Sequence, residues 1–353
     1  MRWNIGWGLT SACNSCCRHC YNASGGANIT QISFEDAKSI VDVLAVHNVE
    51  TINYGTGESG LIPYFWDLVK YVHEKGIEQG LTSNGSSVTE KTMPFIKKYI
   101  NDIDISIDYP DEQRNNDFRG SEHAWNWALN ACNLLKNESI NFSIVTCLHS
   151  LNSDENTILK FLSMCKEFGC EWRVNWFKPT GRGKFDKELK LDPKKVHSIF
   201  RLIVENSVIT ALPDPYFSAI IGFNKRIGAP CGCESFRITP TTEVVPCVYF
   251  TKEMKNLSLL TSSFSEVLDS PLMQIVRKRD VAVCKGCEYE KFCHGGCVSR
   301  AYLEYGSINS PDAFCFKMNG FVDNPLRNLC YVVEDGPKKV HENYLCTLIV
   351  RPK

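Results

Sequence analysis

The first half of the chain alternates short runs of β-branched and aromatic residues with longer runs whose apolar positions recur every three or four residues. The short runs are typical of buried strands, and the longer runs are typical of helices with one apolar face. Strands are predicted over residues 3–9, 50–55, 78–83, 102–108, 141–148 and 171–177. Helices are predicted over residues 33–48, 64–76, 88–99, 121–136, 154–168 and 193–206. This alternation predicts an α/β fold with a parallel sheet, and six βα units indicate a partial (β/α)6 TIM-like barrel.

The second half of the chain differs in residue composition and in helical pattern. Cysteine, glycine and proline become frequent after the last predicted helix, and long helical runs become scarce. We therefore expect a barrel over residues 1–215 and a cysteine-rich domain over residues 216–353.

Composition and charge exclude several classes of protein. The 353 residues are 43% hydrophobic and 22% charged, and the formal net charge is −1. A nucleic-acid binder usually has a basic excess, which this chain lacks. No apolar stretch reaches the ~18 residues that span a bilayer, and the N-terminus lacks the features of a signal peptide. We expect a cytoplasmic protein without membrane or nucleic-acid partners. The first strand begins by residue 3, so we expect no leader-binding domain fused before it.

The 18 cysteines occur in separate groups rather than evenly along the chain. Cys13, Cys17 and Cys20 have the spacing C-x3-C-x2-C, with Cys16 between them. Three thiolates on one loop can hold three irons of a [4Fe–4S] cluster and leave the fourth iron open. Zinc is the competing interpretation, although structural zinc sites use four closed ligands.

This loop, directly after a predicted first strand, resembles the C-x3-C-x-Φ-C loop of radical S-adenosylmethionine (SAM) enzymes. The resemblance makes Cys16 a non-ligand, places His19 against the adenine of SAM, and puts Tyr21 next to the cluster. It also implies the family chemistry, in which the reduced cluster cleaves SAM to a 5′-deoxyadenosyl radical that abstracts hydrogen from a substrate.

Further segments resemble family motifs at the ends of successive strands. The segment "YGTGESGL" (54–61) is similar to the family GGEP segment that receives the SAM amino group; Gly57 and Glu58 match it. The resemblance assigns further SAM contacts to "TSNG", "ISID", "DFRG" and "KPTGRG", namely Asn84, Ser106, Arg119 and Arg182. Each segment alone is equally compatible with a simple turn.

The second cysteine group, "CKGCEYEKFCHGGC", has the spacing C-x2-C-x5-C-x3-C. It resembles the SPASM extension of radical SAM enzymes, which holds two auxiliary [4Fe–4S] clusters. The resemblance assigns one cluster to Cys284, Cys287, Cys293 and Cys315, and the other to Cys231, Cys233, Cys247 and Cys297. The close spacing of Cys231 and Cys233 leaves open that only one is a ligand, and zinc knuckles are the alternative.

The catalytic residue is less defined. Sulfatase-maturing relatives carry an aspartate directly after the cysteine that corresponds to Cys247, whereas this chain has Val248, which cannot act as a base. Cys147, His149 and Tyr109 lie where they could reach a substrate, and a buried inert cysteine is the alternative reading of Cys147.

We therefore expect an enzyme that uses SAM and three [4Fe–4S] clusters. The favoured substrate is a ribosomal peptide or protein side chain, modified by a thioether, a C–C crosslink or epimerisation. The alternatives are a dehydrogenase or epimerase of a small polyol, sugar or amino acid, and a non-catalytic iron–sulfur or zinc module. Expected partners are an electron donor such as flavodoxin or ferredoxin and a separate leader-binding protein.

Overall fold

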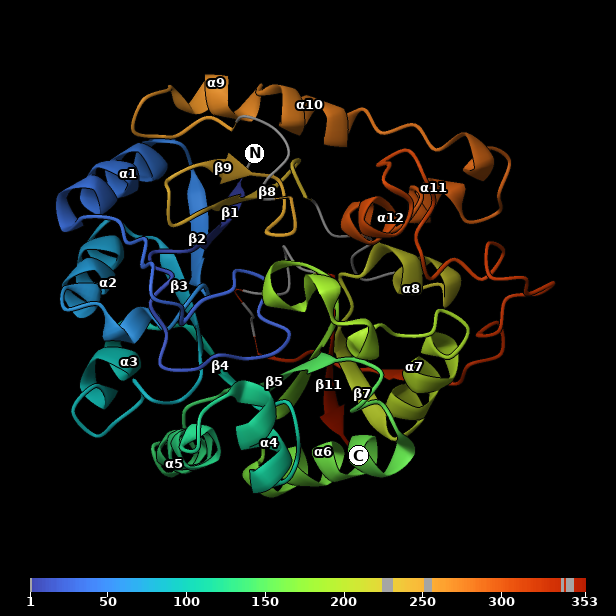
Figure 1. Ribbon diagram of the computed structural model, residues 1–353, viewed down its shortest axis with the longest axis horizontal. Helices are drawn as coiled ribbons and strands as arrows, with labels where there is room; N and C mark the ends of the chain where they lie inside the picture. The colour runs from blue at the N-terminus through green and yellow to red at the C-terminus, as the bar shows by residue number, and fades with distance from the viewer. Residues whose placement is uncertain (1, 224–230, 251–255, 338–339, 341–345) are drawn as a thin grey trace.

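The computed structural model describes residues 2–223, 231–250, 256–337, 340 and 346–353 (Figure 1). Six parallel strands lie side by side in chain order. They are β1 (Trp3–Trp7), β2 (Val49–Tyr54), β3 (Glu78–Ser83), β4 (Asp102–Ser106), β5 (Ser143–Leu148) and β6 (Glu171–Trp176). The predicted α/β partial barrel is confirmed.

Helices cover the outer face of this sheet (Figure 1). They are α1 (Phe34–Val46), α2 (Phe65–Glu74), α3 (Met93–Tyr99), α4 (Glu112–Arg119), α5 (Ala124–Asn137), α6 (Glu155–Phe168) and α7 (Val196–Glu205). Ser33 caps α1, and its hydroxyl accepts from the Asp36 amide at 3.1 Å. The buried face of α1 repeats with helical spacing and consists of Ala37, Ile40, Val41 and Leu44.

Two helices differ from the prediction. Helix α3 begins at Met93 rather than residue 88, because the chain before it turns: the Thr92 amide donates to the Thr89 carbonyl at 3.0 Å. Helix α4 was not predicted. Its sequence is almost entirely polar, and only Asn115, Phe118 and Arg119 are buried, so it carries no apolar stripe for a pattern to detect.

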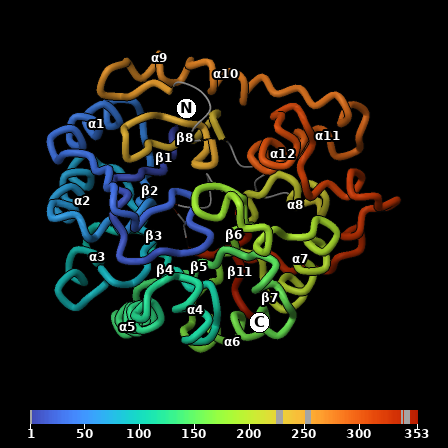
Figure 2. Tube along the Cα trace, in the orientation of Figure 1, coloured from blue at the N-terminus to red at the C-terminus, as the bar shows by residue number. Residues whose placement is uncertain are grey.

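Strands from the second half of the chain extend the sheet at both edges. They are β7 (Ser207–Ala211), β8 (Ser235–Ile238), β9 (Val244–Val245), β10 (Val332–Val333) and β11 (Thr347–Pro352). Strand β8 pairs in parallel with β1, and β11 pairs antiparallel with β6 (Figure 2). In the described part of the chain the sheet runs β10-β7-β11-β6-β5-β4-β3-β2-β1-β8-β9 and does not close into a ring.

The remaining helices are short and belong to the second half of the chain: α8 (Pro215–Ile220), α9 (Phe264–Leu268), α10 (Pro271–Arg277), α11 (Glu290–Cys293) and α12 (Val298–Tyr305). A buried ion triad joins α12 to the N-terminus of α8 and to the segment after α12, because Arg300 on α12 contacts Asp214 at 2.6 Å and Asp312 at 2.7 Å. One hydrophobic core includes residues from both halves, among them Trp176, Phe217 and Phe314.

Candidate active site

A cavity of about 230 Å³ lies at the carboxyl ends of the parallel strands. Alternate residues of the strands face it, and most of these are polar, because successive side chains of a strand point to opposite faces. The alternating residues of β2 to β6 that face the cavity include Asn53, Thr82, Ser106, Val145, Cys147, Arg173 and Asn175. This edge is where parallel α/β barrels place their active sites.

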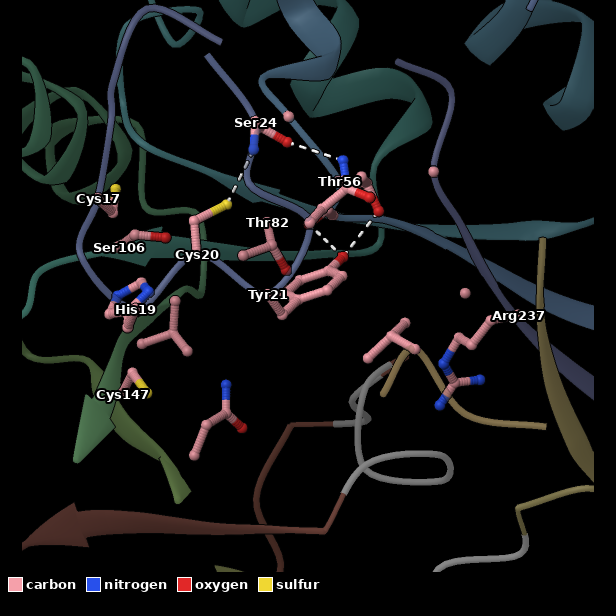
Figure 3. A pocket seen from close by; sticks show the side chains of 18 of the residues that line it. Cys17, His19, Cys20, Tyr21, Ser24, Thr56, Thr82, Ser106, Cys147 and Arg237 are labelled. Atoms are coloured by element: carbon pink, nitrogen blue, oxygen red, sulfur yellow. Dashed lines mark hydrogen bonds between the residues drawn. The ribbon is translucent and has the colours of Figure 1, made fainter. Parts of the chain in front are cut away.

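The loop after β1 brings three cysteines to this cavity. Cys13, Cys17 and Cys20 all line it. Figure 3 shows Cys17 and Cys20 at the cavity. Cys16 is exposed and does not line it, and its thiol donates to the Gly25 carbonyl at 3.3 Å. The Cys20 sulfur accepts a hydrogen bond from the Ser24 amide at 3.3 Å. Such N–H···S hydrogen bonds help to set the reduction potential of iron–sulfur clusters.

The segment after β6, which contains Gly181 and Arg182, holds the cysteine loop in place. Arg182 donates from its guanidinium to the Cys17 carbonyl at 2.8 Å and to the Ser24 carbonyl at 2.6 Å. Gly181 has φ +56°, and a Cβ there would lie 2.2 Å from the Cys20 carbonyl oxygen. Only glycine therefore allows this close approach. Arg182 does not line the cavity, so the contact that the structure gives it is with the loop.

The GGEP-like turn packs on the other side of the cysteine loop. Gly57 has φ +64°, and a Cβ there would lie 2.4 Å from the Ala12 carbonyl oxygen. The buried carboxylate of Glu58 accepts from the Ser83 hydroxyl and the Asn84 amide, each at 2.8 Å. Burial raises the pKa of Glu58. The Asn84 side chain donates at 2.7 Å to Asn14 in the cysteine loop. Gly57, Glu58 and Asn84 all line the cavity.

Asp108 joins two of the residues assigned to SAM. Its carboxylate contacts His19 Nε2 at 2.8 Å and Arg119 Nη1 at 2.5 Å. Burial alone would raise the pKa of Asp108, but the charges of His19 and Arg119 hold it well below its usual range. All three residues line the cavity, and the Arg119 Nε has no hydrogen-bond partner among the described atoms. Asp108 was not among the residues predicted from the sequence. It lies two positions after Ser106, and residues two positions apart in an extended chain point to the same face of a sheet.

Tyr21 also lines the cavity, where its hydroxyl lies 2.7 Å from the Thr56 hydroxyl and 3.2 Å from the Gly55 carbonyl. Burial raises the pKa of Tyr21 to about 12. Burial also raises the pKa values of Cys13 and Cys17, to about 11 and about 12. These two thiols stay protonated at neutral pH unless a metal displaces their protons.

The opposite wall of the cavity comes from the second half of the chain. Cys231, Cys247, Val248, Tyr249 and Cys346 line it. The Cys231 thiol is hydrogen-bonded to the sulfur of Cys247, which lowers the pKa of Cys247 to about 7.

The remaining cysteines assigned to this group differ in placement. Cys297 is buried beside Cys346, and the hydrogen bond between their sulfurs lowers the pKa of Cys297. Cys233 is exposed and does not line the cavity.

The other SPASM cysteines form a second group, away from the cavity. Burial raises the pKa values of Cys284, Cys293 and Cys315, and the charges of neighbouring cysteines of the group, Cys287 among them, add to this effect. Lys317 donates to the Cys287 sulfur at 3.4 Å.

Among the described residues, no three His, Cys, Asp or Glu side chains form a site for a single metal ion. A cubane cluster has a different requirement, because each iron takes its own thiolate. The donor set of thiols with neighbouring N–H and cationic groups fits such a cluster at the N-terminal loop.

The weak catalytic candidates separate in the structure. Cys147 lines the cavity, and its backbone amide donates to Asp108 at 3.0 Å. Tyr109 and His149 do not line it. His149 is fully buried against Phe118, with ring centroids 4.5 Å apart, and burial lowers its pKa to about 3.

Lys178 is a cavity residue that the sequence analysis did not single out. It follows β6, is 6% exposed, and places its ammonium 4.4 Å from the centre of the Tyr249 ring. Burial opposes its charge, but Tyr249, Cys297 and Cys346 raise the pKa of Lys178. A cation therefore faces the cavity on the side of Cys231, Cys247 and Cys346.

Sequence comparison identifies the class of protein. Residues 7–162 match the Radical SAM superfamily, and residues 230–288 match SPASM, an iron–sulfur cluster-binding domain. The chain belongs to the radical SAM superfamily and carries a C-terminal SPASM domain. It is an enzyme of this superfamily, and SAM and iron–sulfur clusters are its cofactors. No helix of the described residues is long and apolar enough to cross a membrane.

Curated relatives span most of the chain. Mycofactocin maturase MftC of Mycobacterium tuberculosis is 24% identical over 327 residues, which are 88% of this chain and 81% of the relative. The AdoMet-dependent heme synthase of Methanosarcina barkeri is 25% identical over 344 residues, which are 90% of this chain and 97% of the relative. The subtilosin biosynthesis protein AlbA of Bacillus subtilis is 26% identical over 300 residues, which are 82% of this chain and 65% of that protein.

Solved structures share the fold. SuiB of Streptococcus suis bound to its precursor peptide SuiA superposes with a TM-score of 0.68 and 16% identity, covering 88% of this chain and 75% of SuiB. The enzyme anSMEcpe with bound AdoMet superposes with a TM-score of 0.70 and 17% identity, covering 89% of this chain and 95% of that chain.

Proposed function

We propose that this protein modifies a side chain of a ribosomally made peptide or of a protein by hydrogen abstraction. The observation that carries the proposal is one cavity with the N-terminal cysteine loop on one wall and SPASM thiols on the other. Cys13, Cys17 and Cys20 would hold an iron–sulfur cluster, which when bound would supply the electron for reductive cleavage of SAM and so for hydrogen abstraction from a C–H bond. A substrate inside this cavity lies next to both groups of thiols.

The chain's own residues orient the cofactor. We assign Gly57 and Glu58 to the amino group of SAM. We assign Asn84 and Ser106 to other polar groups of SAM. Glu58 already accepts hydrogen bonds from Ser83 at the end of β3 and from Asn84 directly after it, so its carboxylate is held rigidly for a further donor.

His19 and Arg119 complete the proposed SAM site. Asp108 fixes the orientation of both side chains, so we assign it a positioning role. Arg182 acts through the cysteine loop, whose carbonyls it holds.

Three [4Fe–4S] clusters are proposed in total, two of them in the domain that we place over residues 216–353. One relative named as a maturase and another named as a bacteriocin biosynthesis protein support a peptide substrate. Val248 lies on the cavity wall after Cys247, so the aspartate base of sulfatase-maturing enzymes is missing there. We therefore favour thioether formation, C–C crosslinking or epimerisation over sulfatase maturation, with flavodoxin or ferredoxin as the reductant and a separate leader-binding protein.

A small-molecule substrate is the second candidate function. The relative that the chain matches over 97% of its length is named as a heme synthase, whose product is not a peptide. Lys178 adds a buried cation to a cavity wall that also carries Arg119, Arg173 and Arg237, and this suits an anionic group on a small molecule or on a peptide.

The test separates these candidates by deuterium transfer. The reconstituted enzyme is incubated with SAM, dithionite and deuterated short peptides encoded beside its gene, and in parallel with deuterated amino acids, sugars, polyols and porphyrins. Deuterium from a peptide side chain in 5′-deoxyadenosine supports the proposal. Transfer from small molecules alone contradicts it. Cys17→Ala is the inactive variant, and Cys16→Ala is its matched control because Cys16 lies outside the cavity.

A further inference from the structure

Four cysteines from four separate segments meet at the SPASM wall of the cavity. The sulfurs of Cys231 and Cys247 are hydrogen-bonded to each other, and so are those of Cys297 and Cys346. The two pairs are neighbours, because the charge of Cys297 acts on both Cys231 and Cys247. Cys346 also interacts with Cys231, so all four thiols belong to one group.

The reversed direction of β11 explains why Cys346 reaches this place. Strand β11 runs antiparallel to β6, with Thr347 paired to Asn175. It therefore begins where β6 ends, at the edge of the sheet that carries the cavity. Cys346 directly precedes β11 and lines the cavity from there.

Cys233 provides a direct contrast. It lies two residues after Cys231, yet it is exposed and does not line the cavity. A residue there has its side chain in solvent, whereas Cys231, Cys247 and Cys346 face a common space.

The surroundings of the four-cysteine group suit thiolates. Two buried cations lie near these sulfurs: Lys178 lines the cavity together with Cys231, Cys247 and Cys346, and Arg300 follows Cys297 on α12. The Cys297 amide donates to Asp312 at 2.6 Å, which fixes the backbone at this sulfur. Buried cations beside several sulfurs offset the negative charge that iron ligation by thiolates introduces.

We propose that Cys346, together with Cys231, Cys247 and Cys297, supplies the four thiolates of the first auxiliary iron–sulfur site, and that Cys233 does not. The proposal rests on the proposed function, which places auxiliary clusters in the second half of the chain. Each thiol releases its proton to solvent when its Fe–S bond forms. The match to the SPASM domain ends at residue 288, so Cys346 lies outside it.

The test compares Cys346→Ala with Cys233→Ala in the full chain, reconstituted without oxygen. Iron and sulfide content and the electron paramagnetic resonance (EPR) spectrum of the dithionite-reduced protein are measured. We expect Cys346→Ala to lose up to about a third of the iron, or to show a changed auxiliary-cluster signal. We expect Cys233→Ala to match the wild type in both measurements. An unchanged Cys346→Ala variant overturns the proposal, and so does an equal loss in both variants.

A second measurement does not depend on how the variants fold. Wild-type protein is alkylated with iodoacetamide before and after iron removal by a chelator, and the labelled peptides are quantified by mass spectrometry. We expect iron to protect Cys346 and not Cys233; protection of Cys233 alone contradicts the assignment. Failure of the proposed function has a different signature, because wild-type protein would then bind no iron at Cys13, Cys17 and Cys20 either.

Discussion

The two groups of thiols at the cavity, one on the N-terminal loop and one on the SPASM wall with Cys297 buried beside Cys346, are built in different ways. Cys13, Cys17 and Cys20 come from one loop of eight residues, and a few hydrogen bonds from neighbouring loops hold that loop. The group with Cys231, Cys247, Cys297 and Cys346 comes from four distant segments, and the tertiary fold brings it together. The first group can be recognised from local spacing, whereas the second depends on strand pairing and buried charges.

The largest effect that separates the two groups is expected from Cys17→Ala. This variant removes one of three cluster thiols from the loop, so we expect SAM cleavage to fall to background while auxiliary iron is retained. Product 5′-deoxyadenosine is measured by liquid chromatography and iron by colorimetry. Wild-type cleavage rates in Cys17→Ala would contradict the assignment of the loop. Cys16→Ala, which changes an exposed thiol, is expected to cleave SAM like the wild type.

The next effect concerns the tertiary framework of the second group. Arg300→Met leaves the buried carboxylates of Asp214 and Asp312 without their cation. We expect the free energy of unfolding to fall by about 3–5 kcal/mol, measured by denaturant titration of the apoprotein. The matched surface variant Arg201→Met, which breaks the pair with Glu205, is expected to lose about 1 kcal/mol or less. Equal losses in both variants would contradict the structural role of the triad.

A smaller effect is expected when the first group is loosened without removing a thiol. Arg182→Met deletes the donors to Cys17 and Ser24 but keeps most of the side-chain volume. We expect about a 10-fold drop in the SAM cleavage rate, because groups that orient metal ligands contribute at this level. The auxiliary EPR signals should stay as in the wild type. A change confined to those signals would contradict the assignment of Arg182 to the N-terminal cysteine loop. Arg2→Met, at an exposed salt bridge, is the control.

The smallest expected effect is the acid sensitivity of two buried histidines. Burial lowers the pKa of His149 to about 3 and that of His197 to about 4, against an ordinary value of 6.5. The unfolded chain therefore binds the proton more readily, and stability is lost as pH falls from about 6.5 toward these values. Each histidine is expected to lower the free energy of unfolding by about 1 kcal/mol between pH 7.5 and 5.5.

Single variants assign this acid sensitivity to each region. His149→Leu, near the cysteine loop, and His197→Leu, near Tyr216, should each reduce the pH-dependent loss of stability measured by denaturant titration. His123→Leu is the exposed control. An undiminished loss in both buried variants would show that other groups dominate.

The sequence allowed the barrel and its helices to be predicted, because β1 to β6 and their crossovers are local patterns of apolar residues. It did not reveal α4, whose exposed face is polar, or β8 and β11, whose places depend on pairing with distant strands. The cysteine loop was identified from its spacing. Asp108 and Lys178 were missed because their importance lies in the charges that face them in three dimensions.

The central claim is that the N-terminal thiols hold a SAM-cleaving iron–sulfur cluster beside a cavity shared with auxiliary thiols. Its most direct test combines metal analysis of anaerobically reconstituted wild-type protein with dithionite-dependent cleavage of SAM. We expect about 12 irons per chain and 5′-deoxyadenosine that forms only with reductant. Stoichiometric zinc in place of iron, with no 5′-deoxyadenosine, would contradict the account.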